Sequence, residues 1–252
     1  MEYDGTNFNG WQTQPHAPSI QDALNLALSA VADEKIQCVG AGRTDTGVHA
    51  VGQVAHFDTV AERPARSWIL GINSNLPEDI SVTWITAVPG DFHARYSATS
   101  RGYRYVILNR RYRSALERHR AWWVHQPLDM ISMAAAAQHL VGEHDFSSFR
   151  AAACQAKTPV RELQRLDIRQ DGDHIVIDCE ANAFLHHMVR NIVGSLARVG
   201  RGEASPDWVA ALLERRDRRL AGMTAPPWGL CLTHVRYPGE LAIPAGMAPL
   251  DD

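Results

Sequence analysis

The sequence predicts an α+β fold, built as two sheet-plus-helix halves in which the strands are mainly antiparallel. Helical and strand-like segments are interspersed without the regular alternation of a doubly wound parallel sheet, and two of the strand-like segments form a β-hairpin pattern. The length of 252 residues is enough for two small domains, each with its own core. We expect these domains at residues 1–97 and 98–240, followed by a tail at 241–252.

Apolar spacing and capping residues predict the helices. Ser19 is followed by apolar residues at helical spacing, and together with Asp22 it resembles a capping box. Further along the chain, Ser205 suits a helix cap and Pro206 suits the first helical position. The predicted helices cover residues 19–33, 64–73, 129–141, 183–199 and 206–215.

Short segments rich in β-branched and aromatic residues predict the strands. Two of these segments are separated only by Asp171-Gly172-Asp173, a turn sequence that favours a hairpin. The predicted strands cover residues 53–58, 80–88, 103–109, 121–125, 163–170, 174–179 and 230–235.

Positive charge is concentrated in one part of the chain, although the formal net charge is −3. The segment from Arg95 to Arg120, which we call the basic segment, holds eight arginines and one acidic residue, Glu117, for a local charge of +7. Guanidinium groups bind phosphate in a bidentate fork and stack on nucleobases. The segment is therefore compatible with a nucleic-acid partner, and a solvated arginine-rich face without a ligand is the alternative.

Composition also predicts the cellular location of the protein, the redox state of its cysteines and the absence of a metal site. No apolar run approaches the roughly 18 to 20 residues needed to cross a bilayer, and the N-terminal sequence does not resemble a secretory signal, so we expect a cytoplasmic protein. The four cysteines form no C-x-x-C pair, which predicts reduced thiols. His186 and His187 would point about 100° apart on the predicted helix, and no acidic or cysteine ligands accompany them in the sequence, so no metal site is expected.

The chemistry is concentrated in a glycine-rich stretch, residues 40–50, with three glycines within eight residues. Glycines allow sharp turns, so this stretch can present Arg43 and Asp45 on a loop. If the stretch is locally extended, side chains two residues apart point the same way, and the two would share a site. The alternative is that Asp45 only caps a turn and Arg43 is its surface partner.

The sequence Gly42-Arg-Thr-Asp-Thr-Gly-Val-His-Ala50 resembles the signature around the catalytic aspartate of the tRNA pseudouridine synthase A family. Other blocks of that family are matched in the same order, and the resemblance extends from residue 2 or 3 to about Tyr237. Family members usually carry several residues before the first block, so the first strand is expected to be truncated here. The further blocks are Tyr3-Asp-Gly-Thr-Asn-Phe-Asn-Gly-Trp-Gln-Thr-Gln14, Asp91-Phe-His-Ala-Arg95, Ser100-Arg-Gly-Tyr-Arg-Tyr105 and Phe184-Leu-His-His-Met-Val-Arg-Asn-Ile-Val-Gly-Ser195.

The resemblance implies a function and a set of site residues. It implies an isomerase that converts uridine to pseudouridine at positions 38, 39 and 40 of the tRNA anticodon arm and acts as a homodimer. Asp45 falls on the catalytic nucleophile and Arg190 on the arginine that pairs with it. Arg43 matches an arginine that helps the target base leave its stack, Tyr103 matches the tyrosine that stacks on the uracil, and Leu230 matches an apolar wall of the pocket.

Pseudouridine formation breaks the N1–C1′ bond and forms a C5–C1′ bond without a change in oxidation state, so no cofactor or metal is expected. The reaction needs a carboxylate, a cation that holds it ionised and an aromatic face for the detached base. Asp45, Arg190 and Tyr103 would supply these groups in a cleft between the two halves. Tyr105, two residues along the same predicted strand, is the rival for the stacking role.

Other interpretations of the same residues are open at this point. Arg190 lies beside the apolar face of the predicted helix 183–199, where a phosphate contact is the alternative to pairing with Asp45. A ribosyl hydrolase would need a second carboxylate that the motifs do not provide. A synthase of the same family that acts on other RNA uridines and a tRNA-binding module without activity are further alternatives. Trp122 and Trp123 are interpreted as core or interface residues rather than as a platform for stacked bases.

Overall fold

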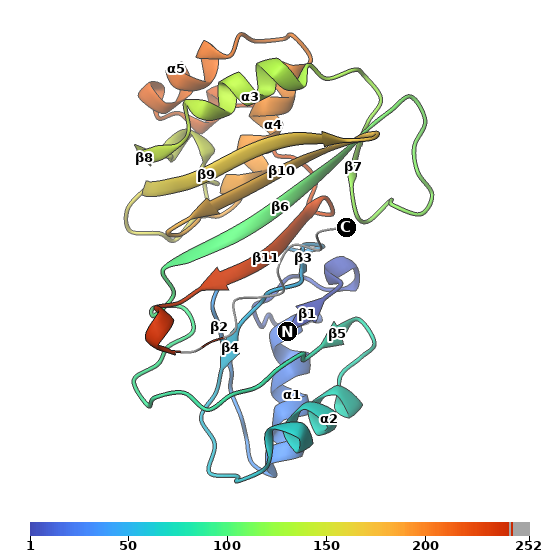
Figure 1. Ribbon diagram of the computed structural model, residues 1–252, viewed down its shortest axis with the longest axis vertical. Helices are drawn as coiled ribbons and strands as arrows, with labels where there is room; N and C mark the ends of the chain where they lie inside the picture. The colour runs from blue at the N-terminus through green and yellow to red at the C-terminus, as the bar shows by residue number, and fades with distance from the viewer. Residues whose placement is uncertain (242, 244–252) are drawn as a thin grey trace. The chain divides into compact units, whose positions relative to one another are not determined.

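The computed structural model describes residues 1–241 and 243, and its contacts divide the chain into two compact units (Figure 1). The first unit comprises Met1–Thr99 together with the described residues from Cys231 onward, and the second comprises Ser100–Leu230. Residues 231–241 join the first unit because β11 (Leu230–Arg236) pairs in parallel with β3 (His49–Ala50). Apart from positions 241 and 243, the predicted tail lies outside the described residues.

In the first unit, three two-residue strands and the longer β11 neighbour one another in the order β5 (Ile80–Ser81), β1 (Glu2–Tyr3), β3 and β11. The pairs β5–β1 and β1–β3 are antiparallel. A separate antiparallel pair is formed by β2 (Val39–Gly40) and β4 (Ala55–His56).

Two helices of the first unit, α1 (Ile20–Ala32) and α2 (Ala65–Asn75), pack against each other. The predicted cap of α1 is confirmed, since the Ser19 hydroxyl accepts a hydrogen bond from the Asp22 amide at 3.1 Å. Gly71 on α2 allows the close approach, because a Cβ there would lie 2.9 Å from a methyl group of Val31.

A histidine pair links β4 to the segment that precedes the second unit. The amide of Ala94 donates a hydrogen bond to His56 Nδ1 at 3.1 Å, and the His56 and His93 rings lie 4.6 Å apart. Burial and the neighbouring His93 lower the pKa of His56 below its ordinary value of 6.5. The folded first unit therefore favours the neutral form of His56.

The second unit contains a mostly antiparallel set of strands. The order is β6 (Ser100–Asn109), β10 (His174–Ala181), β9 (Val160–Asp171) and β8 (Gly142–Asp145), all antiparallel, and β7 (Trp122–Val124) pairs in parallel with β6. The predicted hairpin is confirmed: β9 and β10 are joined by Gly172 and Asp173, and Gly172 adopts the positive φ of 55° that such a turn requires.

Three helices, α3 (Met130–Gln138), α4 (Met188–Gly200) and α5 (Asp207–Arg215), lie together on one side of this sheet (Figure 1). Helix α3 contacts α4, α5 and strand β9. The described 3₁₀ turns are η1 (Gly5–Asn7), η2 (Ser147–Phe149), η3 (Arg218–Leu220) and η4 (Gly239–Leu241). Helices mixed with mostly antiparallel strands confirm the predicted α+β class.

Some predicted boundaries were wrong. The helix predicted at 183–199 begins only at Met188, because His187 adopts a left-handed conformation with φ of 61°. The pair His186–His187 therefore precedes the helix, and its rings lie 4.0 Å apart instead of diverging on helical turns. The predicted cap of α5 was also wrong: the cap position is Pro206, and no side chain caps this helix.

None of the described helices combines the length and the apolar character that a bilayer crossing requires. The four cysteines are free thiols, and two of them, Cys38 and Cys179, are buried.

Candidate active site

The candidate catalytic residue Asp45 lies in the connection between β2 and β3, where the backbone is fixed from both sides. The amide of Trp11 donates to the carbonyl of Thr44 at 3.0 Å, and the amide of Val48 donates to the carbonyl of Asp45 at 3.1 Å. Gly10 has φ of 88°, and a Cβ at this position would lie 2.5 Å from the Thr44 carbonyl oxygen. The two motifs that contain Gly10 and Asp45 are therefore packed backbone to backbone.

Side-chain contacts orient the same loop. The Tyr3 hydroxyl and Thr44 Oγ1 lie 2.8 Å apart, and Gln53 donates to the carbonyl of Gly42 at 2.8 Å. Burial raises the pKa of Tyr3 above its usual 10, so the hydroxyl stays neutral beside the loop. Thr44 is buried, whereas Arg43 is exposed and Asp45 is partly exposed. This alternation is the one that an extended stretch gives, with Arg43 and Asp45 on the side away from the core.

The two candidate stacking tyrosines on β6 have different surroundings. Tyr105 is completely buried, its hydroxyl donates to the carbonyl of Pro226 at 2.8 Å, and burial raises its pKa well above 10. Tyr103 packs edge to face on Phe184, with ring centroids 5.0 Å apart. Both rings are buried, but Tyr105 is fully buried and its hydroxyl is bound to Pro226, which gives it a structural role. Tyr103, which is 8% exposed, is the better candidate for contact with a base.

Arg190 is the third residue of α4, at the positive end of the helix dipole. Its Nε donates to the carbonyl of Ala225 at 2.8 Å, and the Ala225 amide donates back to the carbonyl of Arg190 at 3.0 Å. A guanidinium held through Nε presents its two terminal nitrogens in a defined direction. A cation is unfavourable at a helix N-terminus unless an anion accompanies it, so this position suits an arginine that binds a carboxylate or a phosphate.

Sequence reasoning missed a polar network that holds the segment around Ala225 on α4. The Arg218 guanidinium donates to Asn191 Oδ1, to Thr224 Oγ1 and to the Gly222 carbonyl, each at 2.9 Å. The Thr224 hydroxyl donates in turn to Asn191 Oδ1 at 2.7 Å, and the Gly222 amide donates to Ser195 Oγ at 3.0 Å. We call these residues the Arg218 network.

Close backbone packing supports the Arg218 network. A Cβ at Gly194 would lie 1.7 Å from the carbonyl oxygen of Met223, so only glycine permits the contact between α4 and this segment. Leu230 follows in the same part of the chain; it is buried, and its amide donates to the carbonyl of Pro227 at 2.9 Å. The Gly229 carbonyl accepts from the Val106 amide of β6 at 2.9 Å, so the segment from 222 to 230 is held by α4 at its start and by β6 near its end.

The basic segment does not form one continuous surface. Arg101 is buried and donates to the carbonyl of Asn182 at 2.9 Å, while Arg104 forms a fork with Asp178 at 2.8 and 3.2 Å. Arg95 belongs to the first unit. The remaining arginines lie in the connection between β6 and β7, residues 110–121, and four of them are exposed: Arg111, Arg113, Arg118 and Arg120.

Comparison with known proteins agrees with the resemblance seen in the motifs. The sequence model of the tRNA pseudouridine synthase family matches residues 1–97 and 136–238. A protein named tRNA pseudouridine synthase A from Hydrogenovibrio crunogenus is 54% identical over 244 residues, which cover 97% of this chain and 93% of the relative. Proteins of the same name from Pseudoalteromonas atlantica and Pseudomonas aeruginosa are 54% and 52% identical, over 99% and 97% of this chain and 95% and 86% of their own lengths.

Proposed function

Because the chain belongs to the tRNA pseudouridine synthase family, whose members are isomerases that act on tRNA uridines, we propose that it modifies positions 38, 39 and 40 of the anticodon arm with Asp45 as nucleophile. The observation that carries the proposal is the fixed Asp45 loop, in which Thr44 and Gly10 lock the backbone while the Asp45 side chain keeps access to solvent. A nucleophile must be presented in a fixed geometry, and this loop does so.

The other roles follow from the environments of the residues. Arg190 acts as the cation that pairs with the Asp45 carboxylate; its Nε donates to the carbonyl of Ala225, which defines the direction of the guanidinium. Tyr103 stacks on the detached uracil, and Leu230 forms an apolar wall. Arg43, which is exposed beside Asp45, helps the target base leave its stack.

The proposed reaction is balanced without an external reactant. The N1–C1′ bond breaks, the uracil rotates and C5 bonds to C1′; the proton lost from C5 goes to solvent and N1 gains one. The mass of the RNA is unchanged, whereas a ribosyl hydrolase would release free uracil. The proposed tRNA substrate also supports the predicted cytoplasmic location.

Mapping of pseudouridine in tRNA from cells with and without this protein tests the substrate. The proposal predicts that the modification disappears from positions 38, 39 and 40 and returns when the gene is restored. Unchanged anticodon arms together with a loss at other RNA uridines would instead support a synthase of the same family with a different substrate.

We also propose that the protein is a homodimer, because a tRNA that touches two copies makes more phosphate contacts than one small chain offers. Sedimentation at micromolar concentration is expected to give twice the chain mass of 27.9 kDa. A fully active monomer of 27.9 kDa would contradict this part of the proposal.

A further inference from the structure

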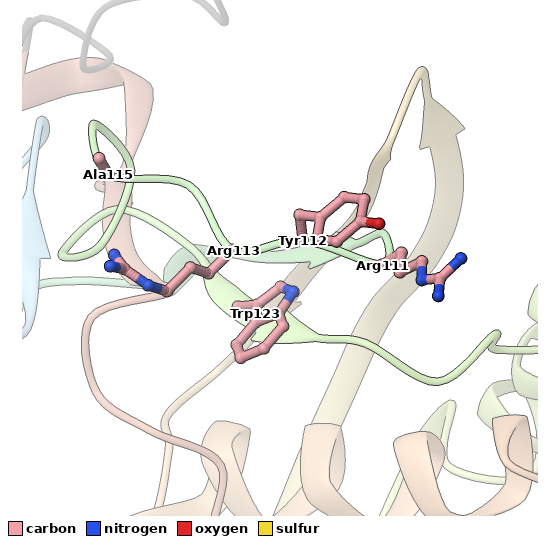
Figure 2. A pocket seen from close by; sticks show the side chains of 5 residues that line it. All are labelled: Arg111, Tyr112, Arg113, Ala115 and Trp123. Atoms are coloured by element: carbon pink, nitrogen blue, oxygen red, sulfur yellow. The ribbon is translucent and has the colours of Figure 1, made fainter.

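A hollow on the second unit lies away from the residues assigned above. It is formed by the connection between β6 and β7, has a volume of about 450 Å³ and is lined by Arg111, Tyr112, Arg113, Ala115 and Trp123. Figure 2 shows the Tyr112 and Trp123 rings between the two arginine side chains, which extend to opposite sides. The hollow therefore combines two aromatic faces with two flanking positive charges.

The Trp123 ring is fixed in this position. Strand β7 places Trp123 opposite Leu108 of β6, and the indole Nε1 donates to the carbonyl of Arg110 at 2.9 Å. Trp122 faces the other side of the strand, where it packs edge to face on Tyr105. The partly buried Trp122 is in keeping with the interpretation of the two tryptophans as core or interface residues, whereas Trp123 is 40% exposed and presents its ring to the hollow.

Tyr112 adds a second exposed ring. It is 71% exposed, and the Arg111 guanidinium lies 5.5 Å from its ring centroid. Proteins bind single-stranded nucleic acid with exposed aromatic rings and nearby arginines. Every base has a face that can stack on a ring, and the guanidinium binds the neighbouring phosphate. Bases inside a duplex offer no free face, so an unpaired nucleotide suits this hollow better than a helical stem.

The hollow is separate from the proposed catalytic residues of the same unit. The connection leaves β6 at Asn109, six residues beyond Tyr103, which at about 3.3 Å per residue corresponds to roughly 20 Å along the strand. The hollow also lies between the two ranges, 1–97 and 136–238, that the family sequence model matches. A nucleotide bound here would thus be a second contact and not the reacting uridine.

We infer that this hollow binds an unpaired nucleotide of the RNA substrate, with the base stacked on Tyr112 and Trp123 and a phosphate bound by Arg111 or Arg113. The inference rests on the proposed tRNA substrate. Its role is to add affinity and to fix the position of the RNA relative to Tyr103, while the reaction itself proceeds on the residues assigned above.

Affinity measurements with unmodified tRNA test the stacking. Tyr112→Ala is expected to weaken binding roughly 5- to 150-fold, the equivalent of about 1–3 kcal/mol for one stacked base, without a change in the salt dependence. Tyr112→Phe keeps the ring and is expected to bind like the parent. Leu116→Ala is the matched control, because Leu116 is 93% exposed in the same connection but does not line the hollow.

Fluorine NMR of protein labelled with 5-fluorotryptophan gives a direct readout. The Trp123 signal, assigned through Trp123→Phe, is expected to shift on addition of tRNA in the parent and in Tyr112→Phe. A Trp123 signal that tRNA leaves unmoved, or equal affinities of Tyr112→Ala and Leu116→Ala, would overturn the inference. If either of these results is obtained while the parent protein forms pseudouridine normally, the inference about the hollow is wrong and the proposed function is unaffected.

Discussion

Removal of the Arg218 side chain is predicted to damage both the stability of the second unit and the reaction. Arg218→Ala deletes three hydrogen bonds from a charged donor, to Asn191, Gly222 and Thr224. Hydrogen bonds to a charged group contribute about 1.5–3 kcal/mol each when buried. Because Arg218 is partly exposed, water replaces some of them, and we expect the free energy of unfolding to fall by about 2–4 kcal/mol. For a chain of this size that corresponds to a Tm lower by roughly 5–15 °C.

The effect on the reaction follows from the contact between Ala225 and Arg190. Without the Arg218 side chain, the segment that carries the Ala225 carbonyl loses three hydrogen bonds of the Arg218 network and is held less firmly on α4, so the direction of the Arg190 guanidinium is less well fixed. A misplacement of about 1 Å in a catalytic group lowers turnover by up to about 100-fold. We therefore expect kcat to fall by roughly 10- to 100-fold while KM for tRNA stays within a few-fold. Tritium release from tRNA labelled at uridine C5 measures both constants below the Tm of the variant.

Arg219→Ala is the matched control for this prediction. Arg219 is the next residue of the same 3₁₀ turn, but its side chain is 88% exposed and pairs with Asp217 at the surface. Such a pair contributes little to stability, so this variant is expected to resemble the parent. Equal Tm and kcat values for Arg218→Ala and Arg219→Ala would refute the reasoning. A lower Tm with unchanged kcat would show that the Arg218 network supports the fold and does not position Arg190.

Three further predictions concern binding, pH and the catalytic cation. Replacement of Arg110, Arg111 and Arg113 by Gln is expected to make tRNA affinity less dependent on salt. The slope of log affinity against log salt concentration is expected to decrease by about 0.7–0.9 for each lost phosphate contact. An unchanged slope would show that these arginines do not bind phosphate. Folding lowers the pKa of His56 below 6.5, so as pH falls the unfolded chain takes up the proton first, and stability is lost as pH falls through about 6.5. His56→Asn is expected to reduce this loss of stability in thermal melts between about pH 7.5 and 5. Identical pH profiles of variant and parent would contradict this prediction. Arg190→Lys is expected to lower turnover strongly with nearly unchanged tRNA affinity, whereas a phosphate contact would give weaker binding with turnover intact at saturating tRNA.

Local signals in the sequence were enough to predict much of the fold. The α1 cap at Ser19 and the β9–β10 hairpin depend on neighbouring residues, and both were visible in the sequence. The start of α4 was not visible in the sequence. Phe184 and Leu185 fit the helical period, and the apolar pattern does not reveal the left-handed backbone at His187. The strands β2 and β3, which were not predicted, contain two residues each, too few to show a period.

The candidate site was predictable only in part, for a similar reason. The glycine-rich motif identified Asp45, and the resemblance assigned Arg190. Counting charges along the chain could not show that Arg104 is neutralised by Asp178, because the two meet only through the register of β6 and β10. The contact of Arg218 with Asn191 likewise joins positions 27 residues apart, and no local pattern distinguished Arg218 from its exposed neighbours.

The most direct test of the central claim is tritium release by Asp45→Asn under saturating tRNA. The substitution keeps the shape of the side chain and removes its charge, so the fold and tRNA affinity are expected to match the parent while turnover falls below detection. Circular dichroism and a binding titration on the same sample establish that the variant is folded and binds tRNA. Appreciable pseudouridine formation by this folded variant would contradict the assignment of Asp45 as nucleophile.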